Sequence, residues 1–146
     1  MLLPSGNFVS KITPIYPGSN FTWGEATKDC TRYLKTLFVD NQLIIYDYQI
    51  EQNIIATAKK LDQLRKQLGD RPIHVNSWYR PQHINALVGG GKWSRHQYGD
   101  GVDIKSDYFS PQQIYRMLRD VHSGGLGRYY SFLHIDWRPE KARWSA

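Results

Sequence analysis

The sequence has only one cysteine, Cys30, in 146 residues. It therefore forms no intrachain disulfide and supplies no multi-cysteine zinc site. No apolar run approaches the roughly 18 residues that a membrane-spanning helix needs, which excludes a segment that crosses a bilayer. An export signal has a basic n-region followed by a long apolar h-region. Residues 1–4 belong to neither kind of segment, so no export signal is visible. Internal repeats and low-complexity tracts are also missing, and nothing indicates a second domain.

The composition is that of a folded, basic protein. Hydrophobic residues make up 40% of the chain and aromatic residues 14%, which is enough for the core of one compact domain. Nineteen Lys and Arg residues against thirteen Asp and Glu give a net charge of +6, which favours nucleic acid, acidic lipid or an anionic cell-wall polymer as partner. Because the basic residues are spread along the chain with no known binding motif, we expect no specific nucleic-acid partner.

Hydrophobic periodicity and capping patterns predict the main elements. Apolar residues recur at three- and four-residue steps over 47–68, and Gly69 supplies a C-terminal stop, which predicts a long helix. Thr22 followed by Glu25 is a capping-box pattern and predicts a short helix over 23–30. Further helices are predicted over 81–88 and from 111 to about 122, and strands over 35–39, 42–46, 73–76 and 132–137.

The order of these elements predicts the fold class and the domain organisation. Helices come early and strands late, without the regular alternation of a doubly wound sheet, so an α+β fold is expected, with helices packed on a small antiparallel sheet. Residues 1–20 contain three prolines and scattered apolar residues and are predicted to form an extended arm with turns. Residues 21–146 are then predicted to form a single domain.

Two histidines and one aspartate in the second half of the chain suggest a site. His96 and Asp103 are separated by glycines at 99 and 101, which mark a turn that can bring both side chains to one point. His134 lies in the predicted strand 132–137. Because strand side chains alternate, His134 and Asp136 share one face, opposite the apolar side chains, and both are expected to face a cleft or solvent.

Two imidazoles and a carboxylate are a common ligand set for catalytic zinc, which keeps a fourth position for water. The ion lowers the pKa of that water from 15.7 to roughly 7. Asp136, on the same strand face as His134, could take the proton and return it to a leaving amine. The residues alone leave another interpretation open, in which a surface histidine lies beside a glycine turn and the strand histidine is satisfied within the fold.

The pattern resembles a known family. Ser94, His96, Gly99 and Asp103, followed by His134 and Asp136, closely resemble the signature of the zinc D-alanyl-D-alanine peptidases, which share the hedgehog/DD-peptidase fold and cleave peptidoglycan stem peptides. The resemblance extends over about 21–146. Segments that match further family blocks, including those of phage and bacterial members, are 21–25, 77–81 and 85–90.

The resemblance implies a role for each site residue. It implies His96, Asp103 and His134 as ligands of Zn²⁺, and Arg80 as the cation beside the substrate carbonyl or carboxylate. Ser94 would contact the substrate or orient the loop that carries the first ligand. Several members have a catalytic acid three residues before the last histidine, where this chain has serine at position 131, so the acid–base role is assigned to Asp136, as in members with the same arrangement.

The function implied by the resemblance is that of a zinc metallopeptidase that hydrolyses peptidoglycan stem peptides through a metal-activated water. It would act as a D-Ala-D-Ala carboxypeptidase or as an endopeptidase, in the manner of an endolysin. The alternative is a non-catalytic, zinc-containing module of the same fold that binds a cell wall or a protein. Action at the bacterial cell wall would need release by phage lysis, delivery by a tail-like device, or a leader that has been removed. The sequence does not indicate the oligomeric state.

Overall fold

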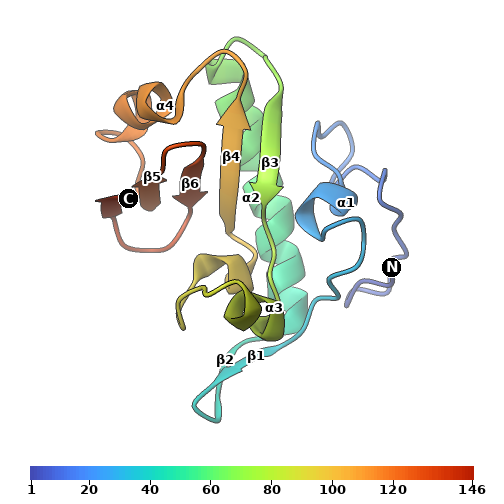
Figure 1. The fold of residues 1–146 in the computed structure, drawn as a ribbon. Coiled ribbons are helices and arrows are strands. Elements are labelled where there is room, and N and C mark those ends of the chain that lie inside the picture. Colours follow the sequence, from blue (N-terminus) through green and yellow to red (C-terminus); the bar gives the residue numbers. More distant parts are fainter.

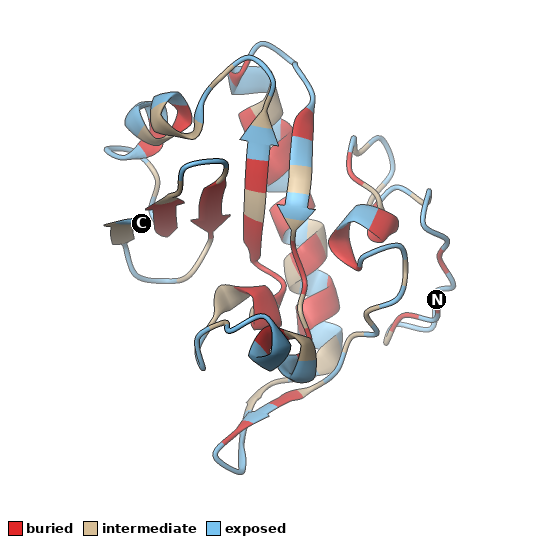
Figure 2. Ribbon diagram, in the orientation of Figure 1, coloured by how far each residue is buried: buried red, intermediate tan, exposed pale blue.

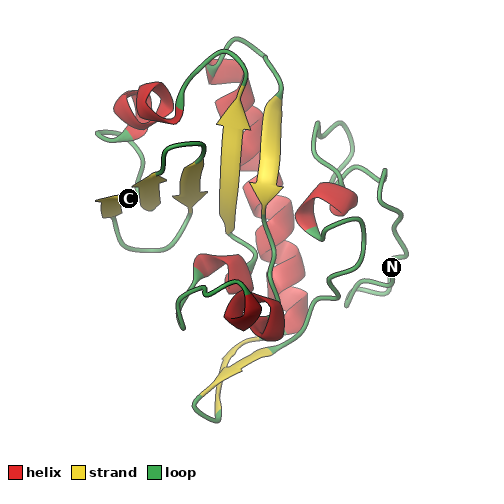
Figure 3. Ribbon diagram, viewed as in Figure 1, coloured by secondary structure: helices red, strands yellow, loops and turns green.

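The computed structural model describes residues 1–146 and has an α+β fold, as predicted (Figure 1). A five-stranded sheet and a separate two-stranded hairpin are joined by four helices and a 3-10 turn, η1 (Figure 3). None of the helices is both long and apolar enough to cross a membrane. In chain order the elements are α1 (Trp23–Ala26), β1 (Leu37–Val39), β2 (Gln42–Ile45), α2 (Asp47–Gln67), β3 (Ile73–Ser77), α3 (Gln82–Leu87), η1 (Arg95–Tyr98), β4 (Gly101–Ser106), α4 (Pro111–Leu118), β5 (Gly125–Arg128), β6 (Leu133–Asp136) and β7 (Ala142–Ser145).

The five-stranded sheet has the order β3-β4-β6-β5-β7. Every pair is antiparallel except β5 and β7, which run parallel. In the register of β4 against β6, Asp103 lies directly opposite His134. Asp103 is also the partner of Ser77 on β3, next to an irregularity in that strand. The sheet therefore brings together residues that are 31 positions apart in the chain.

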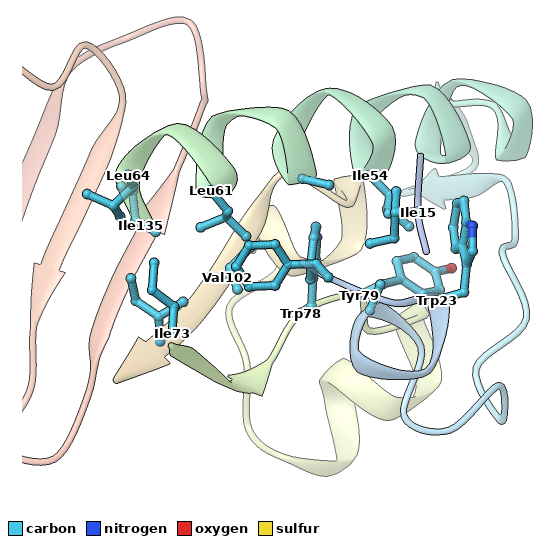
Figure 4. Close-up of a cluster of buried hydrophobic side chains, with 14 of the residues drawn as sticks. Ile15, Trp23, Ile54, Leu61, Leu64, Ile73, Trp78, Tyr79, Val102 and Ile135 are labelled. Carbon is cyan, nitrogen blue, oxygen red and sulfur yellow. The ribbon is translucent and has the colours of Figure 1, made fainter. Parts of the chain in front are cut away.

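The core lies between the sheet and the long helix α2 (Figure 4). Side chains such as Ile54 and Leu61 on the helix and Val102 and Ile135 on the strands are almost fully buried. In Figure 2 the buried residues cover strands β5 and β6 and the side of α2 that faces the strands. Each such side chain stabilises the fold by about 1.5–3 kcal/mol relative to an exposed one. One sheet face is thus occupied by apolar packing.

Residues 1–20 contain no helix or strand and contact α2 through hydrogen bonds to Glu51 and Asp62. Leu3, Val9 and Ile15 from this segment belong to the buried core. The carboxylate of Asp62 on α2 accepts hydrogen bonds from the side chains and backbone of residues 16–20. The arm is therefore packed along the domain, and the boundary at residue 20 stays a prediction.

The structure differs from the predicted elements at several ends. Helix α1 stops at Ala26 rather than at residue 30, because Lys28, Asp29 and Cys30 all have positive φ angles, which end a right-handed helix. Helix α4 ends at Leu118, four residues before the predicted end. Strands β4, β5 and β7 were not predicted. Two of them, β4 and β5, begin with glycine, a residue that is depleted in strands.

Candidate metal centre

Three side chains from separate elements converge at one end of the sheet. His96 comes from the turn η1, Asp103 from β4 and His134 from β6. The Oδ1 atom of Asp103 lies 3.3 Å from Nε2 of His96 and 2.9 Å from Nδ1 of His134. One donor atom from each residue lies within 4.8 Å of the other two. The structure thus brings together the three residues that the sequence resemblance implied as ligands.

The imidazole of His96 is oriented by the backbone around it. Its Nδ1 lies 2.6 Å from the carbonyl oxygen of Trp78, so Nδ1 carries the proton and Nε2 keeps a free lone pair. The backbone N–H of His96 donates to Oγ of Ser94. Gly99 ends η1 in the left-handed region at φ 82°, and its carbonyl accepts the indole N–H of Trp78. Both ends of this short turn are therefore fixed, which aims Nε2 at Asp103.

The imidazole of His134 is held between two carboxylates. Its Nδ1 faces Asp103, and its Nε2 lies 2.7 Å from Oδ2 of Asp136. Asp136 also accepts hydrogen bonds from the guanidinium and backbone N–H of Arg138 and from the N–H of Gly125. A Cβ atom at position 125 would lie only 2.3 Å from this carboxylate, so glycine is needed there. These contacts fix the orientation of the ring, and with a metal ion on Nδ1 the Asp136 carboxylate would hold the remaining proton on Nε2.

The prediction that Asp136 faces a cleft or solvent is wrong. The sequence placed it correctly on the strand face shared with His134, but the residue has no exposed surface. The reason is that β5 and Arg138 cover this part of the face, and neither neighbour was evident from the alternation of β6 alone. Its carboxylate therefore lies behind the His134 ring rather than in the opening beside it.

The electrostatics of the site match a cation between these groups. Burial raises the pKa of Asp103, but hydrogen bonds and charge from His134 and His96 outweigh it and hold this pKa well below its usual range. Burial opposes the charged form of His134, yet the two flanking carboxylates raise its pKa. For Asp136, burial is likewise outweighed, chiefly by Arg138, and its pKa is lowered. Both carboxylates therefore stay ionised near neutral pH.

The donor set fits zinc. Ligand atoms about 2.0–2.1 Å from a tetrahedral Zn²⁺ are about 3.3 Å apart, close to the separations of Asp103 Oδ1 from the two imidazole nitrogens. Two neutral imidazoles and one carboxylate are suitable ligands, and three protein ligands leave a fourth position open. Trp78 and Asp136 provide the hydrogen bonds to the outer ring nitrogens that zinc-binding histidines commonly have.

The three side chains lie in a cavity of about 450 Å³. Arg80 and Ser94, which the resemblance implied as substrate contacts, also line it. The guanidinium of Arg80 makes no hydrogen bond or ion pair within the protein, and its Nε is buried without a partner. Burial chiefly lowers the pKa of Arg80. The cavity thus presents a cation that forms no hydrogen bond or ion pair within the fold, although the charge of Asp103 in the same cavity opposes the effect of burial on its pKa.

Sequence reasoning missed one wall of this cavity. Tyr129 and Trp144 are partly buried and line the cavity together with Phe132 and Arg138, and no pattern in the sequence had singled them out. Trp144 reaches the site because β7 pairs with β5. No motif signals this pairing, since β5 is glycine-rich and β7 is short. Ser131, at the position where several relatives have an acid, does not line the cavity.

Comparison with known proteins identifies the family. A family model described as Peptidase M15 matches residues 19–136, which is most of the chain and includes all three converging residues. The chain belongs to the peptidase M15 family. This M15 chain is also 42% identical over 52 residues to the zinc D-Ala-D-Ala carboxypeptidase of Streptomyces albus G. That match covers 36% of the chain and 20% of the relative, so the chain spans about a fifth of the relative's length in this comparison.

The family assignment confirms the resemblance seen in the sequence. Together with the cluster of His96, Asp103 and His134, it indicates a metallopeptidase domain with zinc as its metal. Residues 137–146, which contribute Arg138 and Trp144 to the cavity, lie beyond the region matched by the M15 model.

Proposed function

We propose that this M15 domain hydrolyses peptide bonds in peptidoglycan stem peptides, as a D-Ala-D-Ala carboxypeptidase or as an endopeptidase. One observation supports the proposal above all others. A three-residue zinc set lies in an open cavity that also contains Arg80, a partly buried cation whose guanidinium forms no hydrogen bond or ion pair within the protein. A site that only stabilises structure has closed coordination and no need for such a cation beside it.

Bound zinc would supply a Lewis acid with an open position, which polarises a carbonyl and activates water. The protein's own contribution is to hold its ligands in place. Nε2 of His96 and Nδ1 of His134 keep their lone pairs because the outer nitrogens are bonded to Trp78 and Asp136. Asp103 adds the negative charge, and its depressed pKa keeps it ionised across the neutral range.

For Asp136 we propose a positioning role rather than proton exchange with the substrate. Its oxygens are occupied by Arg138, Gly125 and His134, and it has no exposed surface. A general base must come within hydrogen-bond reach of the proton that it takes. We therefore assign to Asp136 the task of keeping the proton on Nε2 of His134.

Arg80 would bind an anion of the substrate. A guanidinium can hold a carboxylate through two parallel hydrogen bonds, and burial strengthens the interaction. A peptide with a free C-terminal D-alanine offers such a carboxylate, whereas an endopeptidase substrate offers a carbonyl at the same place. Ser94 also lines the cavity. Its oxygen accepts the His96 N–H, and its own hydroxyl proton has no acceptor within the protein, so this proton is available to the substrate.

The net charge of +6 supports action at an anionic cell wall, outside the cytoplasmic membrane. The D-linkages of stem peptides suit this type of site. Ordinary peptidases select side chains through pockets that fit L-residues, whereas a metal site with one anchored charge needs only the carbonyl and a carboxylate.

The test is to incubate the zinc-loaded protein with muropeptides that end in D-Ala-D-Ala and to read the products by mass. Loss of one alanine identifies a carboxypeptidase, and cleavage within the stem identifies an endopeptidase. Chelation must abolish the activity. Arg80→Gln should lower the activity, whereas Arg116→Gln, an exposed arginine on α4, should not. Zinc binding without cleavage of any muropeptide would favour the non-catalytic binding module instead.

A further inference from the structure

The wall formed by Tyr129, Phe132 and Trp144 has a defined hydrogen-bond pattern. The indole N–H of Trp144 donates to the phenol oxygen of Tyr129 at 3.0 Å. The ring of Tyr129 stacks on Phe132, with ring centres 4.4 Å apart and planes inclined by 10°. All three residues line the cavity that contains the zinc set. The phenol is therefore fixed in position at the side of the candidate metal centre.

Trp144 is held firmly enough to orient this phenol. Its indole packs over Gly127 on β5, where a Cβ atom would lie 2.3 Å from the ring. Its ring centre is 5.3 Å from that of His134. The guanidinium of Arg138 lies over the same indole, 5.2 Å from the ring centre. Contacts with the sheet, with a proposed ligand and with a cation thus define where its N–H points.

The hydroxyl of Tyr129 has a hydrogen-bond donor that the protein does not use. A tyrosine hydroxyl donates one hydrogen bond and accepts others. The oxygen of Tyr129 accepts the indole proton, and no protein atom accepts its own O–H. Arg80, on the lining of the same cavity, is likewise without an acceptor. Burial chiefly lowers the pKa of Arg80, and the charge of Asp103 in the same cavity opposes this effect. The hydroxyl of Tyr129 and the guanidinium of Arg80 therefore both present hydrogen-bond donors without partners to the same cavity.

We propose that Tyr129 is a catalytic residue whose hydroxyl donates a hydrogen bond to the carbonyl oxygen of the scissile bond as negative charge develops on it, and that Trp144 is the residue that positions this hydroxyl. This inference rests on the proposed peptidase function. The phenol keeps its proton throughout and forms no covalent bond. A fixed neutral donor suits an oxyanion that exists only in the transition state, whereas the permanent charge of Arg80 suits a carboxylate that is present from the start.

The decisive variant is Tyr129→Phe, which removes the hydroxyl and keeps the ring that stacks on Phe132. Loss of one oxyanion donor typically lowers kcat by about 10²–10³-fold, and we expect a loss of this order with little change in KM. Trp144→Phe keeps a ring but removes the indole N–H, and it should lower kcat by a smaller factor. Tyr130→Phe is the matched control, because Tyr130 is 91% exposed.

Two further measurements separate catalysis from structure. Zinc affinity should be the same in Tyr129→Phe and the wild type. A peptide phosphinate, which imitates the tetrahedral transition state, should bind the variant more weakly, while the cleavage product binds both equally. An unchanged kcat, or a change in KM alone, would overturn the role of Tyr129 and leave the proposed function intact. If the zinc-loaded wild type cleaves no muropeptide, the proposed function fails first and this inference fails with it.

Discussion

Two carboxylates, Asp62 and Asp136, are buried in different regions of the molecule, and each accepts several hydrogen bonds. Asp62, 8% exposed, lies on α2 and accepts four hydrogen bonds from residues 16–20. Asp136, with no exposed surface, lies on β6 and accepts hydrogen bonds from Arg138, Gly125 and His134. In both cases burial raises the carboxyl pKa, and hydrogen bonds outweigh this effect and lower it.

The difference lies in what the hydrogen bonds hold. Asp62 receives neutral hydroxyl, amide and backbone donors from an arm, and what it fixes is the packing of that arm on the helix. Asp136 binds one full cation and a histidine whose other nitrogen faces the candidate metal position. Burial and a lowered pKa are common to both, so neither property identifies the functional carboxylate. What distinguishes the two is the group that each carboxylate contacts, which is the N-terminal arm for Asp62 and a proposed zinc ligand for Asp136.

The largest expected effect is that of Asp136→Asn. Without the carboxylate, the guanidinium of Arg138 loses its partner, and the proton is no longer held on Nε2 of His134. We expect zinc affinity to fall by about 10–100-fold, as for other groups that support metal-binding histidines. The free energy of unfolding should fall by about 3 kcal/mol, because the buried carboxylate loses its charge-assisted hydrogen bonds while Arg138, 30% exposed, can still reach water. Competition with a chelating dye and urea unfolding measure the two quantities.

The same substitution at Asp62 is the control, and it should leave zinc affinity unchanged. If Asp136→Asn binds zinc as tightly as the wild type but no longer cleaves peptides, Asp136 exchanges protons in the reaction and its positioning role is wrong. That outcome would restore the role predicted from the sequence.

Asp62→Asn should have the next largest effect. An asparagine keeps one carbonyl oxygen but presents an NH₂ group to the hydroxyls of Tyr16 or Ser19, so part of the network is lost. We expect the free energy of unfolding to fall by about 2 kcal/mol, the range for hydrogen bonds to a charged group. Proteolysis within residues 1–20 should become faster. A loss of stability without faster cleavage of the arm would show that the network acts on the domain as a whole.

Acid should weaken the arm contact selectively. Because the pKa of Asp62 is lowered in the folded protein, the carboxylate stabilises the fold above its ordinary pKa of 3.8 and loses this effect as the pH falls below that value. The difference in unfolding free energy between the wild type and Asp62→Asn should therefore be constant near neutral pH and shrink below about pH 4. Urea unfolding of both proteins over this range measures it, and a difference that persists at low pH would contradict the explanation.

The sequence predicted those features that depend on local patterns. The capping box at Thr22, the periodicity of α2 and the alternation around His134 each describe one element by itself. Asp40 and Asn41, both with positive φ, form the tight turn between the two strands predicted over 35–39 and 42–46. The motif around His96 also led to the three converging side chains, because its spacing carries the family resemblance.

What the sequence did not predict depends on pairing between distant segments. The burial of Asp136 and the placement of Trp144 both follow from β5, which lies between β6 and β7 in the sheet. Nothing in a glycine-rich four-residue strand identifies its neighbours, since the pairing is decided by tertiary packing rather than by propensity. For the same reason the aromatic wall of the cavity was not predicted.

The smallest effect is expected where a carboxylate of the same type lies on the surface. Asp40 forms an ion pair with Lys92 at 2.5 Å, but the two side chains are 70% and 53% exposed. Water screens such a pair and the side chains lose entropy in forming it, so Asp40→Asn should change the free energy of unfolding by less than about 1 kcal/mol. Zinc affinity and arm proteolysis should both stay at wild-type values. A loss as large as that of Asp62→Asn would mean that neither burial nor the number of contacts governs what a carboxylate contributes in this fold.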